Sequence, residues 1–248
     1  MATLALHRPD AGNRIDAALA AEFREACRRI SEAEEVRVLV LTGSGERFSA
    51  GREPLPPDLA PAPLPARQAW LEEVRVADSL AGLPVPVIVA INGDALDHGL
   101  ELALAGDLRI CVEAARFGLT DLAREGCFPW DGGTQRLPRL VGPAWASDLI
   151  LTSRIIDAAE ARAIGLVNRV VPAAALQTET TRLAETIAGC GPLAARYAKE
   201  AIHQGRDLSL GQALRLEADL NIILQSTRDR AEGLRSFAEK RPPRFTGE

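Results

Sequence analysis

Hydrophobic residues along the chain alternate between short uninterrupted runs and longer runs with helical spacing. The uninterrupted runs predict buried β-strands at Thr3–Leu6, Val36–Leu41, Pro86–Ile91 and Leu108–Val112. Between them, apolar residues recur every three or four positions, which predicts helices at Ile15–Ile30, Arg67–Ala81 and Gly99–Leu104. Strands that alternate with helices at this spacing form parallel pairs with right-handed crossovers. The sequence therefore predicts an α/β fold.

The pattern becomes mostly helical after Gly133. Helices are expected at 133–140, 143–151, 157–164, 173–189, 192–203, 209–225 and 227–239, with one short strand near Val167–Val171. We place a boundary near residue 190, between a β/α core (1–190) and a helical region (191–248). Residues 53–66 contain six prolines, so we expect a loop or an extended segment there.

Composition and charge narrow the class of protein. The chain has 248 residues, 47% hydrophobic and 25% charged, as is ordinary for a soluble globular protein. The net charge of −5, without a basic stripe, argues against a nucleic-acid partner. The longest apolar runs are too short to cross a bilayer, and the N-terminus has no secretory signal. Four scattered cysteines show neither metal nor redox spacing, so we expect a cytoplasmic protein with reduced thiols and no metal site.

One segment carries the clearest candidate chemistry. In INGDALDHGLELALAGDLRI, residues 91–110, an apolar strand leads into a helix that opens near Asp97 and His98. The first N–H groups of a helix have no internal partner and face any anion beyond them. Glu101 lies three residues after His98, on the same side of this apolar helix. Free N–H donors beside a carboxylate could stabilise an oxyanion while a proton moves.

Five motifs, in order and over nearly the whole chain, carry a family resemblance. They read LHRPDAGNRID, VLVLTGSGERFSAGRE, INGDALDHGLELALAGDLRI, DGGTQRLPRLVG and STRDRAEGLRSFAEKRPPRFTG. Together they resemble the enoyl-CoA hydratase/isomerase (crotonase) superfamily. The resemblance implies a spiral of β-β-α units, followed by C-terminal helices that assemble homotrimers or dimers of trimers. It also implies an acyl-CoA thioester as substrate, with no permanently bound cofactor.

The resemblance assigns roles to three residues. Two backbone N–H groups, those of Arg52 and His98, would form an oxyanion hole for the thioester carbonyl. Glu101 occupies the position of one of the two catalytic glutamates of the hydratases. Large polar side chains replace the family's small residue at 52 and its glycine at 98, which changes the wall of the pocket. The backbone donors do not depend on side-chain type, so the hole could survive both changes.

The second catalytic glutamate is where the sequence departs from the family pattern. The stretch from Phe117 to Gly126 is one residue longer than in the family, so the glutamate slot falls on Asp121 or on Leu122. Asp131 offers a replacement, because members that act on ring-containing acyl-CoA substrates carry a similar aspartate. We expect Trp130 to raise the pKa of Asp131 by desolvation and help it act as a base. Alternatively, Asp131 only caps a helix.

Two further assignments and the functional alternatives complete the expectations. The His98 side chain could bind substrate, shuttle a proton or simply pack, and Asp97 could cap the helix. The resemblance suggests that Phe237 and Lys240 reach the CoA of a neighbouring subunit, although Lys240 could equally be a solvated charge.

The function that we expect first is that of an enoyl-CoA hydratase. The alternatives are an isomerase, a C–C hydrolase that uses Asp131 on a cyclic acyl-CoA, and an inactive or RNA-binding homologue, which the acidic pI of about 5.4 disfavours.

Overall fold

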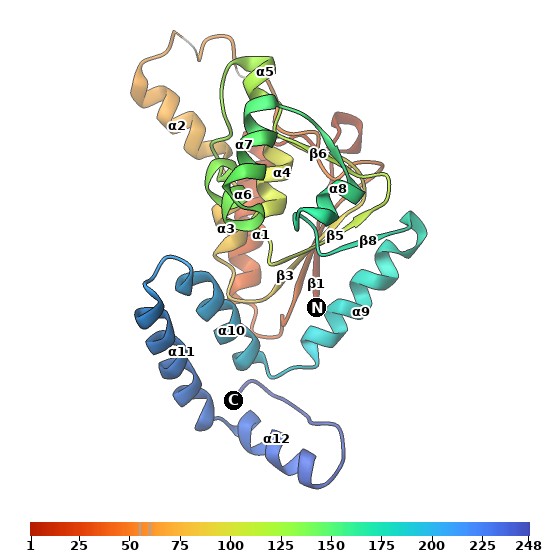
Figure 1. Cartoon of the computed structure of the whole chain (residues 1–248), viewed down its shortest axis with the longest axis vertical. Coiled ribbons are helices and arrows are strands. Elements are labelled where there is room, and N and C mark those ends of the chain that lie inside the picture. The colour runs from red at the N-terminus through yellow and green to blue at the C-terminus, as the bar shows by residue number, and fades with distance from the viewer. Residues whose placement is uncertain (55, 60) are drawn as a thin grey trace.

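A five-stranded parallel sheet forms the body of the molecule. The computed structural model describes residues 1–54, 56–59 and 61–248, so residues 55 and 60 of the predicted proline-rich segment lie outside the described residues. The strands follow the order β1-β2-β3-β5-β8, and every neighbouring pair is parallel (Figure 1). Their bounds are β1 Ala2–Leu6, β2 Leu39–Gly43, β3 Val87–Ile91, β5 Leu108–Val112 and β8 Arg169–Val171. The predicted strands and their parallel arrangement are confirmed.

A second, smaller sheet was not predicted from the sequence. It contains β4 (Ala95–Leu96), β6 (Arg116–Gly118) and β7 (Ile156–Asp157). Strands of two or three residues are too short to show a hydrophobic period. Along the chain, β3 leads to β4 and then to a helix, and β5 leads to β6 and then to helices. This β-β-α succession, with one strand in each sheet, is the arrangement that the family resemblance implied.

The helices follow the predictions with one clear exception. The long helix predicted over Arg67–Ala81 is wrong, because it is two helices, α2 (Leu64–Val74) and α3 (Ala77–Ala81). The chain is extended at Arg75, with φ −68° and ψ 136°. The N–H groups of Val76 and Ala77 bond to the carboxylate of Asp131 instead of to helical carbonyls. Helix α2 also starts inside the segment that was expected to be a loop.

The remaining helices lie close to the predicted ranges, apart from the unpredicted one-turn α5. In order they are α1 Ala17–Glu32, α4 His98–Leu104, α5 Asp121–Glu125, α6 Gly133–Val141, α7 Pro143–Thr152, α8 Ala158–Ala163, α9 Leu176–Ala188, α10 Pro192–Gly205, α11 Leu210–Gln225 and α12 Arg228–Ala238. Within the described residues, no helix combines the length and apolarity that a bilayer crossing requires.

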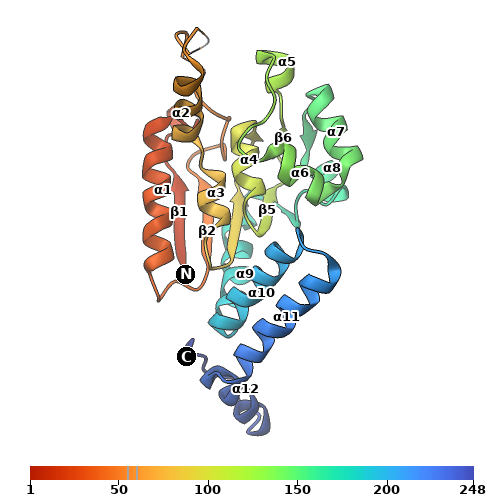
Figure 2. The same ribbon diagram turned by 90° about the vertical axis from the view of Figure 1, so that its left-hand side faces the viewer.

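The last two helices, α11 and α12, extend away from the sheets, as both views show (Figures 1 and 2).

Helix α10, which precedes them, is fixed to the core by the carboxylate of Asp107. Asp107 lies 2.9 Å from the Lys199 ammonium and 2.7 Å from Nε2 of His203. That residues 191–248 form a unit separate from 1–190 stays a prediction.

The core is centred on β3, whose five residues are all buried between β2 and β5. We expect Ile88→Ala to reduce the free energy of unfolding by about 2–5 kcal/mol, because it removes most of a fully buried side chain and leaves a cavity in the core. Urea denaturation would measure this difference. Leu151→Ala on α7, at a leucine that is 70% exposed, is the control and should change it by less than about 0.5 kcal/mol. Equal effects of the two substitutions would contradict the assignment of the core.

Candidate active site

Two segments that run side by side position the predicted site. Ser49 pairs with Ala95 in a parallel bridge, with hydrogen bonds of 3.0 Å from Ser49 N–H to Asp94 O and from Leu96 N–H to Ser49 O. Arg52 and His98 each lie three residues beyond this bridge, and a Cβ added to Gly51 would lie 3.2 Å from Cβ of Asp97. The segments are in close contact, since a Cβ on Gly99 would come within 2.5 Å of the Ser49 side chain. Only glycine fits at position 99.

The backbone N–H groups of Arg52 and His98 are both free of protein partners in the described part of the chain. Ile15 pairs with Arg52 in a parallel bridge through the flanking residues, because Ile15 N–H bonds to Gly51 O and Glu53 N–H bonds to Ile15 O. In such a bridge the central residue directs its own N–H away from the partner. His98 is the first residue of α4, where N–H groups lack intrahelical acceptors.

The expectation that Asp97 caps α4 is wrong. Its carboxylate makes no cap and instead accepts hydrogen bonds from the Thr120 N–H and hydroxyl. The backbone of Asp97 has φ +47°, a conformation that favours glycine. The bonds to Thr120 and the 2.8 Å bond from its own N–H to Gly118 O hold it there. A non-glycine residue therefore occupies this turn because its side chain is anchored.

Glu101 is 1% exposed and sits one turn into α4. Its Oε1 accepts hydrogen bonds of 2.8 Å from the N–H groups of Asp131, just before α6, and of Gly133, the first residue of α6. Burial raises the pKa of Glu101 to about 7, against the opposing effects of His98 and of these N–H donors. The carboxyl group can therefore exist in both protonation states near neutral pH.

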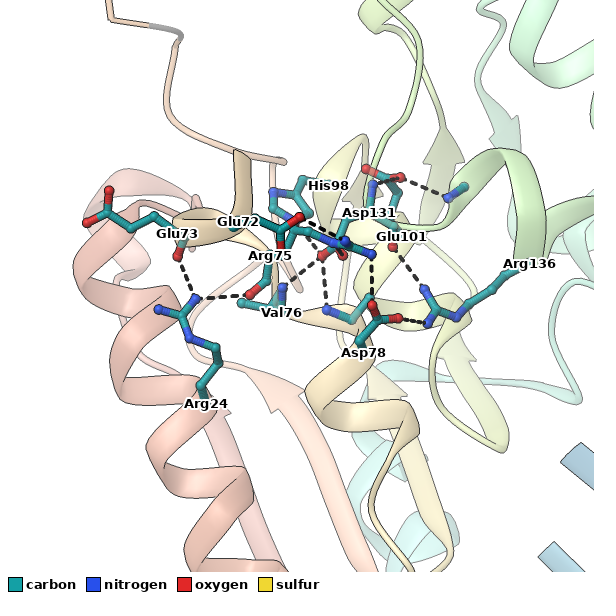
Figure 3. A network of polar contacts seen from close by, with 12 residues as sticks. Arg24, Glu72, Glu73, Arg75, Val76, Asp78, His98, Glu101, Asp131 and Arg136 are labelled. Carbon is teal, nitrogen blue, oxygen red and sulfur yellow. Dashed lines mark hydrogen bonds and ion pairs between the residues drawn. The ribbon is translucent and has the colours of Figure 1, made fainter. Parts of the chain in front are cut away.

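Asp131 is fully buried and serves as the acceptor for several donors (Figure 3). Its Oδ2 lies 2.8 Å from Nε2 of His98 and accepts bonds of 2.8 and 2.9 Å from the N–H groups of Val76 and Ala77. Arg75 approaches Oδ1 at 3.4 Å. The side chain of Asp131 does not cap α6. The N-cap residue of that helix is Gly132, which has no side chain to accept a hydrogen bond.

The expectation of a raised pKa at Asp131 is wrong. Burial alone would raise it, but the hydrogen bond from His98, the positive charge of His98 when its ring is protonated, and the two backbone N–H donors outweigh burial and lower the pKa. Asp131 is consequently an ionised carboxylate with its lone pairs engaged. Its predicted role as a base stays a prediction, although these contacts leave it little capacity to accept another proton.

The imidazole of His98 is buried and packs against Trp130. The ring is 1% exposed, and its centroid lies 5.0 Å from that of Trp130, which in turn lies 5.9 Å from that of Trp70 in α2. While Nε2 faces Asp131, Nδ1 is buried without a hydrogen-bond partner among the described residues. Buried polar atoms in native proteins normally have partners, so this nitrogen needs an explanation.

The side chain of Arg52 is only 3% exposed and meets carboxylates at the start and end of α5. Its guanidinium pairs with Glu125 and lies 3.8 Å from Asp121. Burial and the charge of Asp97 raise the pKa of Asp121 to about 6, although Arg52 opposes them. Of the two residues considered for the glutamate slot, Asp121 is buried and Leu122 is half-buried. The sequence interpretation overlooked Glu125, for which the one-residue insertion before Gly126 was the available signal.

Phe237 and Lys240 do not join these residues within one chain. Phe237 is 85% exposed, and α12 lies at the opposite end of the molecule from α4 (Figures 1 and 2). The structure therefore brings together Arg52, His98, Glu101, Asp121 and Asp131, and leaves the two C-terminal residues apart. The described residues contain no cluster of three or more His, Cys, Asp or Glu side chains suited to a metal ion.

Comparison with known proteins agrees with this arrangement. The sequence profile of the enoyl-CoA hydratase/isomerase family matches residues 1–248. The chain is 37% identical to the crotonyl-CoA hydratase of Syntrophomonas wolfei, covering 99% of this chain and 94% of that protein. It is 37% identical to the (E)-benzylidenesuccinyl-CoA hydratase of Thauera aromatica, with 100% and 96% covered.

Among solved structures, the enoyl-CoA hydratase of Bacillus anthracis is 41% identical and superposes with a TM-score of 0.93, covering 99% of this chain and 95% of that one. The fold is therefore that of the crotonase superfamily, as the motifs predicted. The chain belongs to the enoyl-CoA hydratase/isomerase family.

Proposed function

We propose that the protein is an enoyl-CoA hydratase, which adds water across the double bond of an α,β-unsaturated acyl-CoA. The observation that carries this proposal is the combination of two free N–H groups, on Arg52 and His98, with the buried carboxyl of Glu101 one turn along α4. The hydratase activities named for the two relatives support the same reaction class.

The chemistry requires both features. When water adds to the β-carbon, the electron pair of the double bond moves toward the thioester and an enolate forms. Two N–H donors aimed at the thioester oxygen would stabilise that charge by several kcal/mol. A proton must then be delivered to the α-carbon, and Glu101 is in place to carry it, since its pKa of about 7 keeps a large fraction protonated near neutral pH.

A hydration also needs a group that accepts a proton from water. Two arrangements in the site could supply it: Asp121 beside Arg52, and the hydrogen-bonded pair His98 and Asp131. A double-bond isomerase or a ring-cleaving hydrolase that uses Asp131 as its base is the alternative reaction. The engaged lone pairs of Asp131 favour hydration over that alternative.

We also propose a homotrimer or a dimer of trimers, working in the cytoplasm, with Phe237 and Lys240 contacting the CoA bound to a neighbouring subunit. The support is a set of exposed apolar side chains on the C-terminal helices. This set comprises Ile202, Leu210, Leu214, Ile222, Ile223, Leu234 and Phe237. Exposed apolar surface of this extent indicates a protein interface. The four cysteines are free thiols, as expected in a reducing compartment.

The first test measures turnover with crotonyl-CoA, a β,γ-enoyl-CoA and a cyclic oxo-acyl-CoA. We expect hydration of crotonyl-CoA by the wild-type chain, and a loss of kcat of at least about 100-fold in Glu101→Gln, which cannot transfer a proton. Glu113→Gln, at an exposed glutamate outside the site, is the control and should keep full activity. Absence of turnover with every substrate, together with no CoA binding by calorimetry, would reject the proposal.

The second test concerns the titration of Glu101. An unfolded glutamate ionises near its model value of 4.5, whereas folded Glu101 holds its proton to about 7. The folded state therefore binds more protons between these pH values, so stability from this group is complete below 4.5 and falls as pH rises to about 7. We expect a fall of up to about 3 kcal/mol.

Urea denaturation of wild-type and Glu101→Gln protein at several pH values would measure this contribution as the difference between them. The wild-type chain should lose stability relative to the variant as pH rises from 4.5 to 7, because glutamine does not ionise. A constant difference over that range would show that Glu101 has an ordinary pKa.

The third test concerns assembly. Light scattering after size exclusion should give a mass of three or six copies of the 26.5 kDa chain. Leu214→Asp with Ile223→Asp in α11 should reduce the mass toward one copy, since a buried unpaired charge opposes association. Leu151→Asp, at a leucine on α7 that is 70% exposed, is the control. A monomeric wild-type protein would reject the assembly.

A further inference from the structure

Hydration needs two proton transfers, and the proposed function names a residue for only one of them. Water must lose a proton as its oxygen bonds to the β-carbon, and the α-carbon must gain one. Glu101 is suited to the second step as an acid. The identity of the group that deprotonates water is open, because the family's second glutamate has no exact counterpart in this sequence.

The carboxylates of Asp121 and Asp131 are both already engaged by other groups. The pKa of Asp121 is raised to about 6, but its carboxylate lies 3.8 Å from the buried guanidinium of Arg52, so accepting a proton would give up this ion pair. Asp131 already accepts hydrogen bonds from His98 and from two backbone N–H groups, with Arg75 on its other oxygen. A carboxylate held by this many donors is a weak base.

His98 differs from both aspartates, because one of its ring nitrogens has no partner among the described residues. Because Asp131 is an ionised acceptor, the proton of a neutral imidazole must be on Nε2, which donates the 2.8 Å hydrogen bond. Nδ1 is then an unprotonated nitrogen with a lone pair. It is buried, and the described residues offer it no partner. A carboxylate that fixes the tautomer of a histidine whose other nitrogen is free is the arrangement of a general base.

We propose that His98 is the general base of the hydration, that Asp131 is its positioning residue, and that Glu101 is the acid. This inference rests on the proposed hydratase function. His98 and Glu101 are three residues apart at the start of α4 and therefore face the same side of the helix. The charged groups around His98 are Asp131, Glu101 and Asp121, with Arg75 and Arg52 paired to the aspartates.

The step balances in protons and electrons. Nδ1 of His98 takes a proton from water while the water oxygen bonds to the β-carbon. The π pair of the double bond forms the enolate, whose oxygen faces the N–H groups of Arg52 and His98. The enolate then takes the Glu101 proton at the α-carbon, which leaves the 3-hydroxyacyl-CoA. Imidazolium and carboxylate remain, and proton exchange with solvent restores both groups.

The principal test uses His98→Gln with crotonyl-CoA. Glutamine retains an N–H that can bond to Asp131, and the backbone donor of residue 98 is unchanged, but no base remains. We expect kcat to fall by at least about 100-fold with little change in KM. His203→Gln is the matched control, because His203 forms a similar 2.7 Å contact with Asp107 outside the site and its loss should leave kcat unchanged.

Chemical rescue separates a base from a packing residue. In His98→Ala, added imidazole should restore activity at least about tenfold, because it can occupy the space beside Asp131 and Trp130 and accept the proton. The same imidazole should not rescue Glu101→Ala. Asp131→Asn should reduce kcat by a smaller factor than His98→Gln, since the base is still present but no longer held in one tautomer.

A measurement without activity covers the case in which the variants fail to fold. The chain has only three histidines, so 15N-histidine NMR of the wild-type protein can resolve His98, with His203→Gln used for assignment. We expect the Nε2–H tautomer with Nδ1 unprotonated. Protonated Nδ1 in the neutral ring, or His98→Gln activity within threefold of wild type, would overturn the inference while leaving the hydratase proposal intact. Failure of the wild-type chain to hydrate any enoyl-CoA would overturn both.

Discussion

A buried, ionised carboxylate constrains the centre of this molecule. Asp131 has no exposed surface, and removing its charge from water costs several kcal/mol unless donors replace the lost hydration. Those donors come from the N–H groups that begin α3 and from the imidazole that begins α4. Segments about 30 and 55 residues away in the sequence must therefore meet at one atom before the charge is compensated.

This requirement explains why one predicted helix is two. A continuous helix over 67–81 would have used the N–H groups of Val76 and Ala77 internally and left Asp131 without them. The chain instead breaks at Arg75 and directs both groups to the carboxylate. The local helical preference gives way because an uncompensated buried charge costs more than the few backbone bonds lost at a helix break.

The same rule governs the other large polar side chains of the site. Arg52 meets Asp121 and Glu125, Asp97 meets Thr120, and His98 meets Asp131. Each large polar side chain brought into the site has a partner supplied by another segment. The site is thus a set of pairs between separate segments, and a reversion to the family residue would remove one of these pairs.

The sequence predicts the large sheet and most helices because uninterrupted apolar runs such as Val87–Ile91 and helically spaced apolar residues are both visible along the chain. It does not reveal β4, β6 or β7, which are two or three residues long and are held by pairing between distant segments. The residues of the site follow from the motifs. The partners of Asp131 and Arg52 do not, because they depend on contacts across the fold, and the pKa of Asp131 was therefore predicted in the wrong direction.

The aromatic contacts beside His98 give the protein a property unrelated to catalysis. Of its three tryptophans, Trp70 and Trp130 adjoin each other, and Trp130 adjoins the imidazole. The third, Trp145, lies on α7 and is 44% exposed. Indole emission depends on the polarity and the quenching groups around the ring. Two of the three tryptophans therefore lie where their emission can respond to changes in the candidate active site, so the native protein carries its own optical reporter of that site.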